Sequence, residues 1–199
     1  MASRRVEKMG GRSGLPGFID RLRYHELSRQ GFGLLLLWVC AWFTEPAGEG
    51  RIMAGFLIAL VGQAWRIYAA GVIYKNRKLA STGAYSLVRH PLYLGNFLIL
   101  GGFTLACANL WVVALVVAFF LFYSPAAIRY EDRKLEDIFG DEWREWSRGR
   151  PAMLPTRFSW RANQDAEWDL RQSMIRNGEL VYTLFEIAAA VTLWYRAIV

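Results

Sequence analysis

The chain has few residues of the kinds that bind metals or form disulfides. Its 199 residues include two cysteines and two histidines, and these form no Cys-x-x-Cys pair or Cys/His cluster. Cys40 and Cys107 each lie inside an apolar run, so we expect both to be buried small hydrophobic residues. The sequence therefore predicts no metal site.

Motifs of several common enzyme classes are also missing. The chain contains no Gly-x-Gly-x-x-Gly, no Walker loop, no Gly-x-Ser-x-Gly and no His-Glu-x-x-His. These motifs hold dinucleotides, nucleotide phosphates, an acyl-transfer serine and a catalytic zinc, respectively. The N-terminus is basic, but no apolar run follows it immediately, so it does not have the pattern of a cleaved signal peptide.

Apolar residues are abundant and lie in separate blocks. Hydrophobic residues make up 54% of the chain although 21% of its residues are charged, and the net charge is +7. Basic residues flank the apolar blocks, and membrane topology explains this excess without a nucleic-acid partner. The nine Trp and nine Tyr suit rings that lie at membrane interfaces. We therefore predict an integral membrane protein that contacts membrane lipids and binds no nucleic acid.

Five apolar segments reach or approach the roughly 20 residues that a helix needs to span a bilayer. They cover residues 31–43, 52–74, 92–108, 110–128 and 180–199. Asn109 alone separates the third segment from the fourth, which predicts a tight helical hairpin. The expected fold class is all-α: a polytopic membrane helical bundle with about five transmembrane helices and no Rossmann sheet.

The distribution of Lys and Arg predicts the orientation of the bundle, because cytoplasmic connections are rich in basic residues. Residues 1–30 hold seven Lys/Arg, residues 75–91 hold four and residues 129–178 hold ten, out of 24 in the chain. Five spans place these three regions on one side of the membrane. We therefore expect a cytoplasmic N-terminus and a C-terminus outside.

The region after the fourth span predicts short helices. An apolar stripe indicates a helix that stops at Gly140, and Asp141 caps a second helix that carries Trp143 and Trp146. A further helix is expected over 165–176. We divide the chain into an N-terminal cytoplasmic segment with the first span (1–59), a core with the candidate site (60–155), and a linker helix with the last span (156–199).

The start of the third span carries the first candidate site. Pro91 suits the first position of a helix, and the helix start presents free N–H groups and partial positive charge. Arg89 adds a planar charged donor, and His90 adds a donor or acceptor that changes with pH. Tyr93 lies one turn further on, and Gly95 allows a backbone or a ligand to approach closely. These residues can bind an anion or a ligand carboxylate, although a plain membrane boundary has similar composition.

A second candidate site follows the fourth span. Glu131 and Asp132 are adjacent acids, which are costly near hydrocarbon unless they are paired. Glu131 is a candidate to bind a cationic or hydroxylated ligand, and Arg129 is a candidate to hold a substrate carboxylate or phosphate. The short hairpin returns these residues to the face that carries Arg89 and His90, so we expect the two sites to meet. Taken alone, the acids also suit a solvated helix face.

Three polar residues lie inside predicted spans. Gln63 and Arg66 fall in the second span and must face the bundle or a water-filled cavity. An intramembrane Arg is functional by default, but Arg66 can equally extend toward the cytoplasmic end. Glu186 in the last span is a similar, weaker candidate. The segment 156–199 otherwise has no functional interpretation from the sequence.

These residues together resemble the isoprenylcysteine carboxyl methyltransferase family and its relatives, the phospholipid methyltransferases. The pattern of that family is a Leu, a Gly-x-Tyr and an Arg-His-Pro-x-Tyr-x-Gly, then a helical hairpin, paired acids, Leu, Phe-Gly and two aromatic residues. The matching residues here are Leu79, Gly83, Tyr85, Arg89, His90, Pro91, Tyr93, Gly95, Glu131, Asp132, Leu135, Phe139, Gly140, Trp143 and Trp146.

The resemblance implies a membrane enzyme that binds S-adenosylmethionine at the cytoplasmic face and takes a lipid-like or prenylated substrate from the membrane. It implies catalytic roles for Arg129 and Glu131, with Arg129 in contact with the substrate. The cofactor-binding residues that it implies are Leu79, Tyr85, Arg89, His90, Pro91, Leu92, Tyr93, Gly95 and Glu131.

Several positions depart from the family pattern, mostly after the hairpin. Asp132 replaces the second Glu of the acid pair, and Trp143 and Trp146 replace two Tyr. Gly149-Arg150-Pro151 replaces Arg-Val-Pro, and Arg77 replaces a frequent His. These changes affect the expected substrate more than the expected cofactor.

The residues of the candidate site bear on which atom of the substrate accepts the methyl group. A carboxylate acceptor is already a nucleophile and needs only an orienting group such as Arg129, whereas an amine must first lose a proton to Glu131 or His90. We expect carboxylate O-methylation in preference. The alternatives are a phospholipid N-methyltransferase, an NADPH-dependent enzyme like the membrane sterol reductases, and a non-catalytic membrane scaffold.

Overall fold

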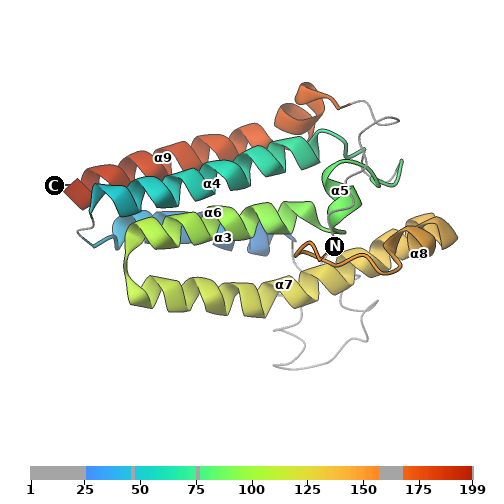
Figure 1. Cartoon of the computed structure of the whole chain (residues 1–199), viewed down its shortest axis with the longest axis horizontal. Coiled ribbons are helices and arrows are strands. Elements are labelled where there is room, and N and C mark those ends of the chain that lie inside the picture. Colours follow the sequence, from blue (N-terminus) through green and yellow to red (C-terminus); the bar gives the residue numbers. More distant parts are fainter. Residues whose placement is uncertain (1–25, 46–47, 75–76, 157–167, 199) are drawn as a thin grey trace.

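A computed structural model of the chain describes residues 26–45, 48–74, 77–156 and 168–198. The regular elements within these ranges are all helical, and the long helices lie side by side in a bundle (Figure 1). The elements are α3 (Glu26–Trp42), α4 (Glu49–Ala70), α5 (Ala84–Leu87), α6 (Pro91–Cys107), α7 (Leu110–Phe139), α8 (Asp141–Ser147), the π-helix η1 (Gln172–Arg176) and α9 (Glu179–Ile198). The all-helical fold class predicted from the sequence is confirmed.

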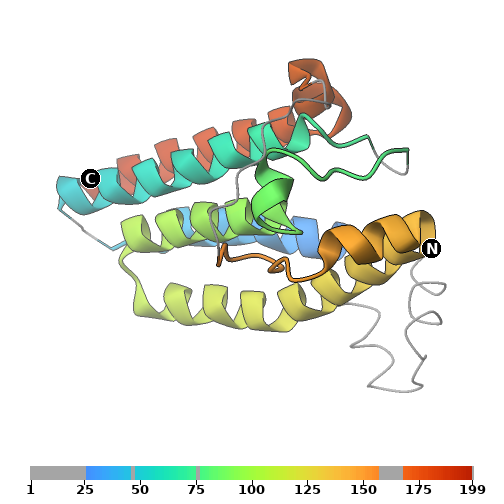
Figure 2. The ribbon, with the colours of Figure 1, turned by 45° about the vertical axis from the view of Figure 1, so that its right-hand side comes forward.

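The five long helices alternate in direction. The α3–α4 connection, the α6–α7 turn and the end of α9 lie at one end of the bundle, whereas α5, α8 and η1 lie at the other (Figures 1 and 2). The basic regions before the third span and after the fourth therefore share one end, as predicted. That this end faces the cytoplasm stays a prediction, and the N-terminal basic segment lies outside the described residues.

Three of the helices, α4, α7 and α9, are long and apolar enough to cross a bilayer. Two shorter apolar helices accompany them, Gln30–Trp42 within α3 and Pro91–Cys107. The chain thus forms a helical membrane bundle. Of the roughly five predicted transmembrane helices, three reach full spanning length, whereas α3 and α6 fall short of the usual ~20 residues.

Helix α7 continues well beyond its apolar part. Its 30 residues correspond to a length of about 45 Å, against about 30 Å for a bilayer core. The helix predicted through residue 139 is therefore a rigid extension of the fourth span. Asn109 begins α7 by accepting hydrogen bonds from the backbone N–H groups of Trp111 and Val112, at 3.0 and 3.3 Å. Gly140 ends it with a positive φ of 55°.

Helices α4 and α6 pack closely through two pairs of glycines. Gly55 faces Gly102, and Gly62 faces Gly95, so that the backbones of the two helices meet. A methyl group at Gly62 would lie 2.9 Å from the carbonyl oxygen of Gly95. This contact is of the small-residue kind common between membrane helices, and it fixes where α6 begins relative to α4.

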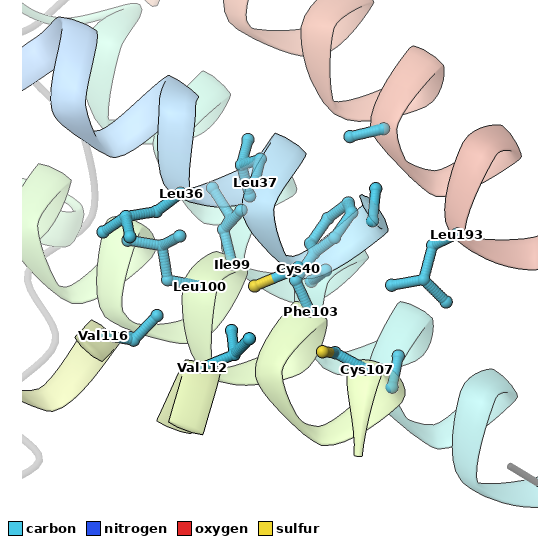
Figure 3. Close-up of a cluster of buried hydrophobic side chains, with 14 of the residues drawn as sticks. Leu36, Leu37, Cys40, Ile99, Leu100, Phe103, Cys107, Val112, Val116 and Leu193 are labelled. Atoms are coloured by element: carbon cyan, nitrogen blue, oxygen red, sulfur yellow. The ribbon is translucent and has the colours of Figure 1, made fainter. Parts of the chain in front are cut away.

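The apolar core lies between α3, α6, α7 and α9, with Phe103 and Leu193 buried near its centre. Figure 3 shows these side chains pointing toward one another from the separate helices. Cys40 and Cys107 are both free thiols and both buried, as predicted from their apolar surroundings. Leu37, Ile99 and Leu100 of this core also line a cavity that extends to α5 and α8.

The short helix η1 covers the end of α4. The last carbonyls of a helix have no partner within it. Ser173 Oγ donates to the carbonyl of Ile67, and Asn177 Nδ2 donates to the carbonyl of Ala70, both at 2.8 Å. The first part of the helix predicted over 165–176 lies outside the described residues, and its second part is mainly the π-helix.

Candidate functional site

A cavity of about 400 Å³ lies between α3, α4, α6, α7 and α9 and extends to α5 and α8. Ligand pockets commonly have volumes of about 300–1,000 Å³. Seven of the ten residues predicted for the site line the cavity. They are Leu79, Tyr85, Arg89, His90, Leu92, Tyr93 and Glu131.

The other three predicted residues do not line it. Pro91 begins α6 as expected, and its carbonyl accepts a hydrogen bond from Trp65 Nε1 at 3.0 Å. Gly95 faces α4, where the stem of Arg66 packs against it. Arg129 is exposed. Pro91 and Gly95 thus have a structural place at the start of α6, and the geometry adds no support for a substrate contact by Arg129.

Asp132 joins the two candidate sites predicted from the sequence. Its Oδ2 accepts a hydrogen bond from Arg89 Nη1 at 2.7 Å, and its Oδ1 lies 2.8 Å from His90 Nε2. His90 is 6% exposed and Asp132 is 22% exposed, so water screens the contact weakly. When Nε2 donates to Asp132, Nδ1 of the neutral imidazole is left as an acceptor. Asp132 therefore positions both side chains, while its neighbour Glu131 lines the cavity.

Arg89 retains one donor that the protein does not use. Its Nε is buried and has no hydrogen-bond partner among the described residues. A buried donor without a partner is costly, and the cost is removed when a ligand supplies an acceptor oxygen. Because Arg89 lines the cavity, this atom is consistent with a ligand that carries a carboxylate or hydroxyl group.

Tyr85 presents a neutral phenol to the cavity. It lies in α5, which follows the positive-φ residue Gly83, and it is 8% exposed. Burial raises the pKa of Tyr85, and the negative charge of Glu131 raises it further. The phenol therefore keeps its proton and acts as a hydrogen-bond donor or acceptor at neutral pH.

The segment after α8 is hydrogen-bonded to the loop that carries Arg89 and His90. The backbone N–H of Arg89 donates to the carbonyl of Pro151 at 2.9 Å. The backbone N–H of His90 donates to the carbonyl of Ala152, also at 2.9 Å. Because the backbone on both sides of this contact is fixed, the side chains at the start of α6 have a defined direction.

Arg150, a departure from the family pattern, supports the same loop. Its Nη1 donates to the backbone carbonyl of Tyr85 at 3.2 Å. Its guanidinium lies 4.7 Å from the centroid of the Trp146 ring. Arg150 therefore helps to hold Tyr85, a residue of the cavity, in place.

The last helix contributes two residues that the sequence did not single out, Glu179 and Tyr182. They line the cavity together with Glu186 of α9 and Arg66 of α4, which were candidates from the sequence. Arg66 lies near the end of α4 and forms an ion pair with Glu179, the first residue of α9. Its Nη2 and Nε donate to the two carboxylate oxygens of Glu179 at 2.7 and 3.0 Å, and Asn96 accepts from its Nη1. The signal in the sequence was the presence of ionisable residues within apolar spans.

The cavity combines polar and apolar walls. Its polar residues come from the start of α6, from α7 and from α9, whereas its apolar walls come from α3, α6 and α7. The main apolar residues are Leu34, Leu37, Ile99, Leu100, Phe119 and Phe120. Within the described part of the chain, no group of three or more His, Cys, Asp or Glu side chains could hold a metal ion. The arrangement suits a ligand with a polar and an apolar part.

Comparison with known proteins connects this region to methyltransferases. Residues 50–142 match the family described as phospholipid methyltransferase. The chain is 40% identical over 104 residues to the cobalt-zinc-cadmium resistance protein CzcN of Cupriavidus metallidurans, a match that covers 52% of this chain and 47% of that protein. No solved structure matches the chain.

Two further relatives have enzyme names. The chain is 30% identical over 122 residues to a probable protein-S-isoprenylcysteine O-methyltransferase of Oryza sativa subsp. japonica, covering 57% of this chain and 62% of that protein. It is 33% identical over 75 residues to methanethiol S-methyltransferase 1 of Bradyrhizobium diazoefficiens, covering 38% and 25%. The chain spans about half the length of the first of these relatives, with 47% of CzcN covered.

Proposed function

Because residues 50–142 match the phospholipid methyltransferase family, we propose that the protein is an S-adenosylmethionine-dependent methyltransferase of this family with a lipid-like acceptor. The observation that carries the proposal is the cavity in which His90, Tyr93 and Glu131 meet around the start of α6. His90 and Tyr93 belong to the start of α6 and Glu131 to α7, and the folded bundle brings the two elements together.

The residues in the cavity fit the chemical groups of this cofactor. The unpartnered Nε of Arg89 suits its carboxylate, and the carboxylate of Glu131 suits its ammonium group or a ribose hydroxyl. The neutral phenol of Tyr85 suits a further hydrogen bond. When bound, S-adenosylmethionine supplies a methyl group on an electrophilic sulfonium. The role of the protein is to orient the donor and the acceptor and to exclude water.

The apolar walls support a lipid-like acceptor. Residues of α3, α6 and α7 give the cavity an apolar side within a membrane bundle, and a lipid chain is the natural ligand for such a surface. The names of the relatives describe methyl transfer to different atoms, sulfur in one and oxygen in the other. The preference for a carboxylate acceptor, predicted from the sequence, depended on Arg129, which is exposed. We therefore propose the donor and the lipid-like class of acceptor, including prenylated lipids, without choosing O, N or S.

We also propose that the reaction takes place at the cytoplasmic face. The end of the bundle with α5 and α8 carries the cavity residues Arg89 and Glu131 and the basic connections of the chain. An excess of Lys and Arg in short connections favours the cytoplasmic side.

Methyl transfer by the purified full chain tests the proposal. The protein is incubated with methyl-labelled S-adenosylmethionine and lipids extracted from its host, and label in the lipid fraction is measured. We expect transfer by the wild type, a loss of at least about tenfold for Glu131→Ala, and full activity for Glu136→Ala, which lies outside the cavity lining. Absence of transfer by a folded wild type that binds NADPH tightly would contradict the proposal and favour a reductase.

A further inference from the structure

Helix α9 lies outside the family segment 50–142, yet it forms one wall of the cavity. Glu179, Tyr182 and Glu186 line that wall. Their spacing of three and four residues places them on one face of the helix. The other face of α9 carries exposed apolar residues such as Val181 and Leu184, as expected for contact with lipid. Glu179, Tyr182 and Glu186 therefore share the side of α9 that faces the cavity.

The two arginines that line the cavity are each paired with a carboxylate of the protein itself. Arg66 is paired with Glu179 at 2.7 Å, and their side chains are 7% and 2% exposed. Arg89 is paired with Asp132, also at 2.7 Å. Each guanidinium charge is therefore already matched by a carboxylate of the protein, and the Nε of Arg89, which suits the cofactor carboxylate, is the donor of this pair that stays unpartnered among the described residues. The two lysines of the lining, Lys78 and Lys134, belong to the loop before α5 and to the extension of α7.

Glu186 is the acidic residue of this wall that forms no hydrogen bond or ion pair with another described side chain. It lies seven residues after Glu179, two turns further along the apolar span. Among the described residues no hydrogen bond or ion pair joins its carboxyl group to a side chain, in contrast to Glu179. A carboxyl group in a membrane span is costly unless it pairs or faces a functional cavity. Since Glu186 faces the cavity, a ligand group is the partner that remains.

We propose that Glu186 is a specificity-determining residue, which binds a positively charged or hydrogen-bond-donating group of the methyl acceptor in the part of the cavity walled by α9. The inference rests on the proposed function and deepens it, because it assigns a chemical property to the acceptor. The carboxylate of Glu186 accepts a hydrogen bond from an N–H or O–H group of the acceptor head. An acceptor whose head presents only a carboxylate is disfavoured there by repulsion between like charges.

The test compares Glu186→Ala and Glu186→Gln with the wild type, with Glu49→Gln as a matched control at the exposed start of α4. Labelled methyl transfer is measured with host lipid extract, with phosphatidylethanolamine vesicles as an amine probe, and with micelles of an S-prenyl thiopropionate, whose head is a carboxylate alone, as a carboxylate probe. Calorimetry measures S-adenosylmethionine affinity in parallel. Labelled lipids from the extract are separated by head group.

We expect label in lipids whose heads carry N–H or O–H groups. For such an acceptor, Glu186→Ala should raise KM by about tenfold or more, because a charge-assisted hydrogen bond is lost. Glu186→Gln should spare a neutral donor, since its amide oxygen still accepts, and should impair a cationic one. The affinity for S-adenosylmethionine should stay unchanged in both variants, and Glu49→Gln should behave as the wild type.

Several results would overturn the assignment. An unchanged acceptor KM in Glu186→Ala would do so, as would an equal loss of S-adenosylmethionine affinity, which would make the residue part of the cofactor site. Preferential methylation of the carboxylate probe by the wild type would also contradict it. A wild type that neither binds S-adenosylmethionine nor transfers methyl groups would instead refute the proposed function itself, and the calorimetry separates that case from the others.

Discussion

Asp132 shows how one short side chain organises the candidate site. It is the second acid of a pair in which the resembling family has Glu, and its shorter side chain still contacts both Arg89 and His90. Arg89 is 23% exposed, so its charge depends on this counterion more than a surface arginine would. Asp132 in place of Glu therefore still positions Arg89 and His90, while Glu131 faces the cavity.

Replacing Asp132 by Asn tests this role at the scale of one residue. The amide keeps the size but removes the charge, so Arg89 loses its counterion and His90 loses a charged acceptor. We expect a loss of about 1–2 kcal/mol in the free energy of unfolding and weaker S-adenosylmethionine binding, measured by denaturation in detergent and by calorimetry. The control is Asp141→Asn, since Asp141 is 88% exposed and pairs with Arg144 on the surface. Equal effects of the two changes would contradict the positioning role.

The sequence was most informative where a side chain acts on its own backbone neighbours. Pro91 at the start of α6, Asn109 before α7 and Gly140 after it are found where their local chemistry predicts them. The sequence could not predict the pairing of Arg66 with Glu179, because these residues are 113 positions apart and meet only through tertiary packing. The sequence shows a charged residue at Arg66, but it does not show that Glu179 is its partner.

At the scale of elements, the contact between α4 and α6 positions the start of the site. Gly55 and Gly102 meet so closely that a side chain on either would press on the backbone of the other helix. Gly101 and Gly102 are adjacent in the sequence, and a single sequence does not show which of them meets α4. Gly102 faces α4 and is buried, whereas Gly101 is exposed with open space beside it.

These neighbouring glycines provide a matched pair of variants. We expect Gly102→Ala to lower the free energy of unfolding by about 1–3 kcal/mol, because the added methyl group forces the helices apart. Gly101→Ala should leave it unchanged or raise it slightly, since alanine is the better helix former. Thermal unfolding in detergent measures both. Similar behaviour of the two variants would show that the helices do not meet at Gly102.

Helix α9 is the element for which sequence reasoning gave least. Its apolar composition predicted a span, and its bounds, Glu179–Ile198, agree closely with that prediction. Its place in the cavity wall depends on how it packs against α3 and α4, and a single sequence carries no direct signal of such packing. The exposed fraction of Arg129 was equally out of reach, because it depends on the rotation of α7 about its axis.

At the scale of the whole molecule, the apolar core and the cavity share a wall. Leu37, Ile99 and Leu100 belong to both, and the charged connections lie at the end of the bundle with α5 and α8. The alternating direction of five helices, predicted from hydropathy and basic residues, is what brings the loop before α6 and the extension of α7 to the same end. The family segment covers α4 to α7, and α3 and α9 complete the cavity from outside it.

The central claim, a cofactor site at the start of α6, is tested most directly by calorimetry of S-adenosylmethionine with the purified full chain. We predict binding by the wild type and no comparable binding of NADPH. His90→Ala and Glu131→Ala should each weaken the affinity by about tenfold or more while the protein stays folded, whereas Glu136→Ala should bind as the wild type. Unchanged affinity in both site variants, or tight binding of NADPH without S-adenosylmethionine, would contradict the account.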